Sequence, residues 1–336
     1  MSIDKASGGG PRQGLGRIAA LAGIVLALAG GGWWLSHRGQ AQPSDDVLIV
    51  GDQRGGVQAL LKASGELDHV PYKIEWALFP AAAPLLEALN SGAIDIGGIG
   101  GQPFAFAYAS GAKIRVVYAG RQIASPDRGQ GSAIIVPADS PLRRIEDLKG
   151  RKLATIRGSA GQDLALRLFE RHGLQPSDVK WVYLNNAEAK GALASGSVDA
   201  WSTWSAYVGY ALLKDHQRAL GDARELDAQA GFYAANDKAI AHKRALITDF
   251  IKRLVQARLW VAHNKDAYAA VLSKETGLPV DVARFTVNDL ITEPVPVDDR
   301  LKAEQLAILA RYKRVGIIDK VPNLDGAFDS TFPVAP

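Results

Sequence analysis

An α/β fold of two similar domains around a shared cleft is predicted by three features of the sequence. Short runs rich in β-branched residues alternate with segments whose apolar residues recur every three or four positions, which indicates strands and helices in mainly parallel sheets. One eight-residue motif occurs twice, about 104 residues apart, which indicates an internal repeat. Glycine-rich turns follow predicted strands in both copies, where open α/β sheets bind ligands.

The chain has 336 residues, 47% of them hydrophobic, which is enough for two domains with their own cores. Strands are predicted at residues 47–50, 72–76, 114–118, 134–136 and 153–156. Helices are predicted at residues 84–91, 162–172, 187–195, 240–263, 278–290 and 301–315. The last three helices follow the repeat and need a sheet to cover.

The repeated motif reads ALNSGAID at residues 88–95 and ALASGSVD at residues 192–199. In each copy a helix ends at a glycine, which tolerates the left-handed conformation of many helix ends, and a strand follows. A second pair, RGG at 54–56 and RGS at 157–159, repeats at nearly the same offset. Ser-Gly after a helix is common by itself, but two matches in one register indicate two similar halves.

The repeat predicts a discontinuous first domain and an inserted second domain. The first comprises residues 46–133 and 230–336, so that the late helices cover its sheet, and the second comprises residues 137–228. The chain crosses between them twice, which predicts a hinge near 134–137 and 229–232.

Residues 1–41 have the layout of a secretory signal. Basic residues precede an apolar run at 18–29, and small residues three apart end at Ala41. The alternative is a retained membrane anchor, because apolar residues continue to Leu35 and approach membrane-spanning length. There is no twin-arginine pair and no cysteine to carry a lipid. We therefore predict export, with tethering if the leader is retained.

Basic charge is concentrated in this leader. It holds Lys5, Arg12, Arg17 and Arg38 against Asp4, so its removal lowers the net charge from +4 to +1. The remaining chain has no cluster of lysines and arginines of the kind that binds nucleic acid. Cysteine is absent, which excludes disulfides, thiolate metal sites and cysteine nucleophiles.

The starts of two predicted helices are candidate anion sites. Backbone N–H groups at a helix start lack internal partners and carry partial positive charge, so they suit a ligand with several oxygens. Arg54 can contact such an anion or be solvated or paired, and Ser159 can donate to the ligand or cap its helix. The residues predicted to bind here are Gln53, Arg54, Gly55, Gly158, Ser159 and Ala160.

Gly101 and Gln102 lie at a third turn from strand to helix, after a glycine run. The glycines either admit the ligand to the backbone or allow close strand packing. Where the chain returns to the first domain, Phe232 or Tyr233 is expected to close over the ligand; the alternative is that either is a core residue of a strand. Of these four residues, Gly101, Gln102 and Phe232 are the predicted ligand contacts.

The corresponding turn in the second half carries aromatic and hydroxyl side chains in place of glycines. We predict that Trp201, just past a strand, and Ser202 face the ligand. Trp204 and Tyr207 are three residues apart on a helix, so at least one of them is expected in the core. An aromatic wall opposite N–H donors suits a ligand with one charged and one apolar end.

Catalysis, nucleotide binding and metal binding lack their usual patterns. The six histidines are scattered, no nucleophile elbow joins a strand to a helix, and the glycine run matches neither nucleotide-binding motif. Asp95 and Asp199 recur in the repeat and could serve as an acid and a base, but their position after helix ends indicates structural support. No cofactor is predicted.

Several short motifs occur in an order that resembles the aliphatic-sulfonate-binding proteins of the nitrate, taurine and sulfonate ABC importers. The resemblance covers residues 47–333. The motifs are FPA at 79–81, LEALN at 86–90, DLKG at 147–150, GS at 158–159, DAW at 199–201 and GLP at 277–279.

The resemblance implies the two-domain clamp of type II periplasmic binding proteins. It implies a monomer in the periplasm that captures a small organosulfur anion and delivers it to an inner-membrane permease with a cytoplasmic ATPase. It also implies that the sulfonate is held by the Gln53 region, the Gly101 turn and the helix start at Gly158 and Ser159, with Trp201 at the cleft.

Two positions depart from the family pattern. The family often has Thr-Gly-Asp at residues 99–101 and Trp-Asp-Pro-Tyr at 204–207, whereas this chain has Ile-Gly-Gly and Trp-Ser-Ala-Tyr. Both carboxylates are missing, which favours an alkyl or aryl sulfonate or a sulfate ester over a zwitterion such as taurine. Nitrate, a pyrimidine, or the role of a tethered sensor domain are the alternatives.

Overall fold

Residues 46–123 and 130–332 are described by the structure, a computed structural model. The segment Asp45–Pro336 forms a single unit. The leader predicted at residues 1–41 lies outside the described residues. Within the described ranges, no helix is both long enough and apolar enough to cross a membrane.

The first sheet has six strands in the order β11-β4-β10-β3-β1-β2. β1 is parallel to β2 and β3, whereas β10 is antiparallel to β3 and β4, and β11 is antiparallel to β4. The strands are β1 (Val47–Gln53), β2 (Lys73–Phe79), β3 (Ile96–Gly100), β4 (Ile114–Gln122), β10 (Ala230–Asn236) and β11 (Thr292–Val295).

The second sheet has five strands in the order β7-β6-β8-β5-β9. β6 is parallel to β7 and β8, and β5 is antiparallel to β8 and β9. The strands are β5 (Ser132–Val136), β6 (Lys152–Thr155), β7 (Lys180–Tyr183), β8 (Ala200–Trp204) and β9 (Arg218–Asp222).

The two sheets repeat one topology, which confirms the internal repeat. The order β2-β1-β3-β10-β4 in the first sheet matches β7-β6-β8-β5-β9 in the second. In both, the carboxylate of the repeated aspartate accepts from the backbone N–H near the start of a neighbouring strand. Asp95 accepts from Ile49 and Asp199 accepts from Lys152, each at 2.8 Å. These aspartates therefore support the fold, as the sequence indicated.

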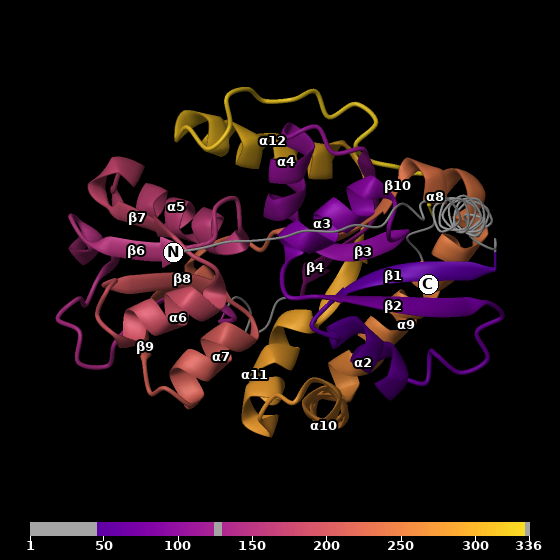
Figure 1. Cartoon of the computed structure of the whole chain (residues 1–336), viewed down its shortest axis with the longest axis horizontal. Coiled ribbons are helices and arrows are strands. Elements are labelled where there is room, and N and C mark those ends of the chain that lie inside the picture. The colour runs from indigo at the N-terminus through magenta and orange to yellow at the C-terminus, as the bar shows by residue number, and fades with distance from the viewer. Residues whose placement is uncertain (1–45, 124–129, 333–336) are drawn as a thin grey trace, which may run out of the picture. The chain divides into compact units, whose positions relative to one another are not determined.

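Helices cover both faces of the first sheet, with one core cluster on each side. Figure 1 shows α3, α4 and α12 on one side and α2, α10 and α11 on the other. The helices are α2 (Gly56–Ala63), α3 (Ala82–Ser91), α4 (Gly101–Ala109), α8 (Asp237–His242), α9 (Arg244–His263), α10 (Lys265–Thr276), α11 (Val280–Leu290) and α12 (Asp299–Arg314).

The long helix predicted at residues 240–263 is broken at Lys243. The Lys243 side chain is only 5% exposed, and its ammonium lies 2.7 Å from the Asp95 carboxylate. At the residue that makes this buried ion pair the backbone departs from helical geometry (φ −122°, ψ 24°), and α8 ends and α9 begins there. Periodicity could not predict the break, since the apolar spacing continues through it and the partner of Lys243 is distant in sequence.

The second sheet is covered by α5 on one face and by α6 and α7 on the other, again with a core cluster on each side. The helices are α5 (Ala160–His172), α6 (Asn186–Ala194) and α7 (Ala206–Leu213). Short 3-10 helices are η1 (Ile145–Leu148), η2 (Pro176–Asp178) and η3 (Ala223–Glu225).

The chain passes between the sheets twice, from β4 to β5 and from β9 to β10. β5 and β10 occupy equivalent antiparallel positions in opposite sheets. β5 directly follows β4 of the first sheet along the chain but lies in the second sheet, and β10 directly follows β9 of the second sheet but lies in the first. The predicted hinge segments, 134–137 and 229–232, lie within or beside these two strands.

Candidate functional site

A cavity of about 450 Å³ lies between the two sheets, where β1, β3 and β8 reach their carboxyl ends. Ligands of open α/β sheets bind at this edge because strand ends and helix starts converge there. Its polar side chains come from both sheets and their helices and include Asp52, Gln53, Arg54, Gln102, Arg167, Asn186, Ser205, Tyr207, Asp227, Gln229, Tyr233, Arg258, Tyr268 and Thr292.

The residues predicted from the sequence divide into two groups. Gln53, Arg54, Gln102, Ala160 and Phe232 line the cavity. The others do not, and they are Gly55, Gly101, Gly158, Ser159, Trp201 and Ser202. An adjoining cavity of about 350 Å³ shares the wall of Trp204 and Pro103 and is lined by Gly158 and Ser159, so these two remain close to the first.

The start of α2 is occupied by Asp52, which is not among the ligand contacts predicted from the sequence. The Asp52 carboxylate accepts from the backbone N–H groups of Val57 at 3.0 Å and Gln58 at 2.9 Å. The donors expected here for an anion are therefore already engaged. Asp52 is 2% exposed, and burial raises the pKa of its carboxyl to about 6. The sequence did carry a signal for this role, because an aspartate stands between a predicted strand and a glycine turn and aspartate often caps a helix start.

Ser159 caps α5, so the alternative of capping is the one observed. Its hydroxyl accepts from Gln162 N at 3.3 Å and donates to the carbonyl of Ile156 at 2.7 Å. The backbone N–H of Gly158 donates to Gln162 Oε1 at 2.7 Å. The N–H groups of Gly158 and Gln162 are consequently satisfied within the protein. A Cβ on Gly158 would lie 2.7 Å from the Phe106 ring, which explains the glycine.

Trp201 and Ser202 lie in the core because β8 continues to Trp204, beyond the predicted end of the strand. Both are 0% exposed, and the Ser202 hydroxyl donates to the carbonyl of Gly161 at 2.6 Å. On the second sheet's side, the aromatic residues of the cavity wall are instead Trp204 and Tyr207. The strand end can be inferred from the repeat, since β3 ends at the corresponding Gly100.

Arg54 joins the two sides of the cavity. Its guanidinium donates to the hydroxyl of Tyr207 and lies 4.8 Å from the centroid of that ring. Arg54 follows β1 of the first sheet, and Tyr207 lies on α7 beside the second. Arg54 is exposed, so it is paired and also accessible to a ligand.

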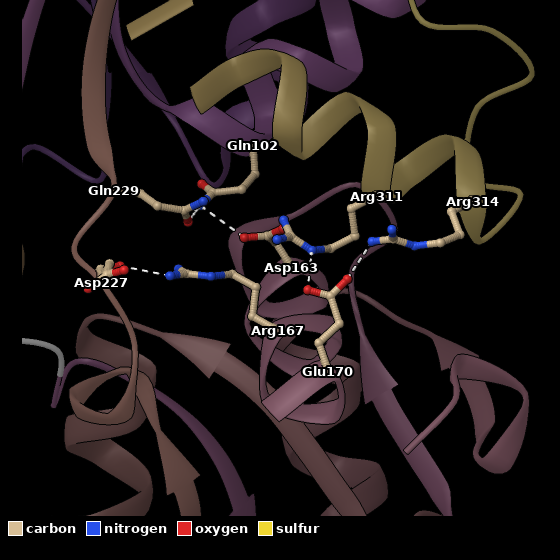
Figure 2. Close-up of polar contacts among 8 residues, drawn as sticks. All are labelled: Gln102, Asp163, Arg167, Glu170, Asp227, Gln229, Arg311 and Arg314. Carbon is tan, nitrogen blue, oxygen red and sulfur yellow. Dashed lines mark hydrogen bonds and ion pairs between the residues drawn. The ribbon is translucent and has the colours of Figure 1, made fainter. Parts of the chain in front are cut away.

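Gln102 and Arg167 form one end of the cavity, and Figure 2 shows their polar contacts. The Gln102 side-chain amide donates to Gln229 and lies 3.5 Å from the Asp163 carboxylate. Arg167 donates to the backbone carbonyl of Asp227 at 2.8 Å. Helices from both sheets thus meet behind this wall.

Asp163 at the start of α5 carries the buried charge of this cluster. Its carboxylate pairs with Arg311 of α12 at 2.9 Å, and Arg311 also contacts Glu170 at 3.2 Å (Figure 2). Burial raises the pKa of Asp163, and the nearby Arg311 opposes that rise. Arg314 pairs with Glu170 at 2.6 Å on the exposed rim. These ion pairs connect the second sheet's helix to the first sheet's helix.

Tyrosines and an arginine form the opposite end of the cavity. Tyr233 of β10, Arg258 of α9 and Tyr268 of α10 line it together with Thr292. The Arg258 guanidinium donates to the Thr292 hydroxyl, and the Tyr268 hydroxyl donates to the carbonyl of Gly56 at 2.7 Å. The described part of the chain has no cluster of three or more residues that could hold a metal.

Comparison with known proteins gives consistent results. The model of the family described as NMT1/THI5 like matches residues 79–267. A protein of Escherichia coli (strain K12) named as an aliphatic sulfonates-binding protein is 35% identical over 262 residues, covering 77% of this chain and 81% of that protein.

Two solved structures have the same fold. The periplasmic aliphatic sulphonate binding protein SsuA from Escherichia coli is 30% identical, with a TM-score of 0.74 over 87% of this chain and 94% of that one. The alkanesulfonate-binding protein SsuA from Xanthomonas axonopodis pv. citri, bound to MOPS, is 28% identical, with a TM-score of 0.75 over 84% of this chain and 98% of that one. The predicted two-domain clamp is confirmed.

Proposed function

Because this chain belongs to the NMT1/THI5-like family and is related along most of its length to aliphatic-sulfonate-binding proteins, we propose that it captures an organosulfur anion for an ABC importer. The ligand is an alkyl or aryl sulfonate or a sulfate ester. The observation that carries the proposal is the cavity between the sheets, which is lined by Arg54, Arg167 and Arg258.

The charge of the cavity suits a permanently ionised ligand. A sulfonate keeps its charge at any working pH, so its receptor needs hydrogen-bond donors and positive charge and needs no titrating base. Guanidinium groups supply both, since arginine stays protonated and presents several N–H donors. Asp52 lines the same cavity, but its oxygens already accept from the start of α2.

We propose that the ligand has no amine close to its charged end. Gly101 begins α4 and Ser205 lines the cavity, at the two positions where the family resemblance implies carboxylates. Without a carboxylate there, an ammonium group gains no partner and pays for its desolvation. Taurine should therefore bind more weakly than an alkanesulfonate of similar length.

Binding is proposed to close the two sheets' domains on the ligand, with rotation near residues 134–137 and 229–232. A ligand that contacts both sides favours the closed state by the difference between its affinities for the two states. The closed, monomeric protein would present the ligand to an inner-membrane permease whose cytoplasmic ATPase drives import. We place it in the periplasm and assign it no catalytic role.

Thermal unfolding with a panel of compounds tests this function. A ligand at about 100 times its Kd stabilises the protein by about 2.7 kcal/mol. Butanesulfonate and an aryl sulfonate should raise Tm, taurine should raise it less, and each should be recovered unchanged. A response to nitrate or a pyrimidine alone would contradict the organosulfur ligand, and product formation would contradict a pure binding role.

A further inference from the structure

Three polar groups lie together at the end of the cavity nearest α9, and we call them the tyrosine-arginine recess: Tyr118, Tyr233 and Arg258. Tyr233 of β10 is paired across the sheet with Tyr118 of β4 on one side and with Gly98 of β3 on the other. The side chains of Tyr118 and Tyr233 therefore lie on the sheet face that α9 covers, and Arg258 projects from that helix.

The recess contains polar atoms that have no partner. The hydroxyls of Tyr118 and Tyr233 and Nε of Arg258 are buried, yet they have no aligned hydrogen bond with any described residue. Tyr118 is 1% exposed and Tyr233 is 2% exposed. Buried polar groups in native proteins are almost always hydrogen-bonded, and each one left without a partner is costly. Tyr233 and Arg258 line the cavity and Tyr118 lies directly beside its lining residue Gly120, which indicates that the ligand supplies the missing acceptors.

Two glycines of the cavity wall leave these atoms accessible. A Cβ on Gly120 would lie 3.0 Å from the Tyr118 hydroxyl and 3.0 Å from Nη1 of Arg258. A Cβ on Gly98 would lie 3.1 Å from the Tyr233 hydroxyl. Both glycines line the cavity, so the space next to each hydroxyl is kept free of side chains.

The recess has positive charge and donates hydrogen bonds. The Arg258 guanidinium lies 5.6 Å from the centroid of the Tyr118 ring and 5.8 Å from that of Tyr233, so the two rings hold it in place. Burial raises the pKa of Tyr233, which keeps its hydroxyl protonated. The other titratable groups nearby, Asp52 and Tyr268, already make hydrogen bonds to the backbone around α2.

We propose that this recess is the seat of the ligand's charged group, whose oxygens accept hydrogen bonds from Tyr118, Tyr233 and Arg258. This inference rests on the proposed function and specifies which end of the cavity binds the oxyanion. A sulfonate has three oxygens and one full charge, which matches two neutral donors and one guanidinium. The organic part of the ligand then extends toward the wall of Trp204 and the adjoining cavity.

Isothermal titration of the protein with butanesulfonate tests the assignment. Tyr118→Phe and Tyr233→Phe should each weaken binding roughly 10- to 100-fold, because each removes a hydrogen bond to a charged group. Arg258→Gln should weaken it on the order of 100-fold or more. The two phenylalanine variants should unfold at the same Tm as the unliganded parent or higher, since each removes a buried hydroxyl that has no partner.

Tyr312→Phe is the matched control. Tyr312 is 0% exposed, its hydroxyl likewise has no partner among the described residues, and it lies on α12 away from the cavity lining. This variant should bind butanesulfonate as the parent does. Arg167→Gln, at the opposite end of the cavity, should weaken binding less than Arg258→Gln.

The outcomes separate the two proposals. Parent-like affinity of Tyr118→Phe, Tyr233→Phe and Arg258→Gln, with a large loss in Arg167→Gln, would overturn the recess and leave the proposed function standing. If the parent protein binds no sulfonate, the proposed function fails and this inference fails with it. Loss of affinity in the recess variants together with lower Tm in the absence of ligand would show a structural role and contradict the assignment.

Discussion

Asp52 illustrates how one side chain changes the use of a whole helix start. Its carboxylate occupies the N–H groups of Val57 and Gln58, which an anionic ligand could otherwise have used. Burial raises its pKa to about 6, so the carboxylate is held at a cost that hydrogen bonds only partly offset. The glycine turn at residues 54–56 was recognisable in the sequence. The spacing of residues alone did not reveal that the Asp52 carboxylate would accept the hydrogen bonds of the N–H groups after this turn.

Asp52→Asn should make stability less dependent on pH. A carboxyl with a raised native pKa binds its proton more tightly in the folded state, so stability is lost as pH rises from 3.8 to about 6. Asparagine can still accept from Val57 and has no charge to bury. Urea unfolding measures the free energy of unfolding of the variant minus that of the parent. This difference should increase by on the order of 3 kcal/mol from about pH 3.5 to about pH 7.5, a size set by the gap between the unfolded pKa of 3.8 and the folded pKa of about 6.

Asp227→Asn provides the comparison, because this second aspartate of the cavity wall is exposed. The free energy of unfolding of the Asp227→Asn variant should equal that of the parent at both pH values. A constant difference in unfolding free energy between Asp52→Asn and the parent across this range would contradict the buried carboxylate.

Among the elements, α5 and α12 show what links the two sheets. Asp163 is almost fully buried (1% of its side chain exposed) and Arg311 is 14% exposed, whereas Arg314 is 66% exposed. The ion pair is thus partly shielded from water, and its removal leaves a buried charge. The same contacts hold the wall that carries Gln102 against α5 (Figure 2).

Arg311→Ala should lower the free energy of unfolding by about 3–5 kcal/mol at neutral pH, because Asp163 would remain buried without its partner. Arg314→Ala should cost under about 1 kcal/mol, since its ion pair is exposed. The defect of Arg311→Ala should shrink as pH falls, because protonation of Asp163 removes the unpaired charge. Urea unfolding at two pH values measures this, and equal losses for the two arginines would contradict it.

The extent of each element marks what the sequence could and could not predict. Periodicity located β1, β2, β4, β5 and β6 and about half of the helices, and the repeat located equivalent positions in the two halves. It did not show that β8 continues to Trp204. Trp201 lies inside that strand and is buried because helices cover both faces of the second sheet. Tyr118, Tyr233 and Arg258 come from β4, β10 and α9, so no local pattern in the sequence could bring them together.

For the whole molecule, the repeated halves explain why one cavity can be lined from two sheets. Each half places its strand ends and helix starts at the same edge, and the chain exchanges β5 and β10 between them. The two-sheet architecture was predictable because composition, periodicity and repeat all indicated it. The location of the charged ligand group was not, since it depends on which donors the folded protein leaves without partners.

The most direct test is a sulfur anomalous map of a crystal grown with butanesulfonate and without sulfate. The chain has no cysteine, and Met1 is its single methionine, so the ligand's sulfur is easily distinguished. We predict one sulfur peak between the sheets, beside the hydroxyls of Tyr118 and Tyr233 and the guanidinium of Arg258. A peak only on the outer surface, or no ligand peak at saturating butanesulfonate, would contradict the account.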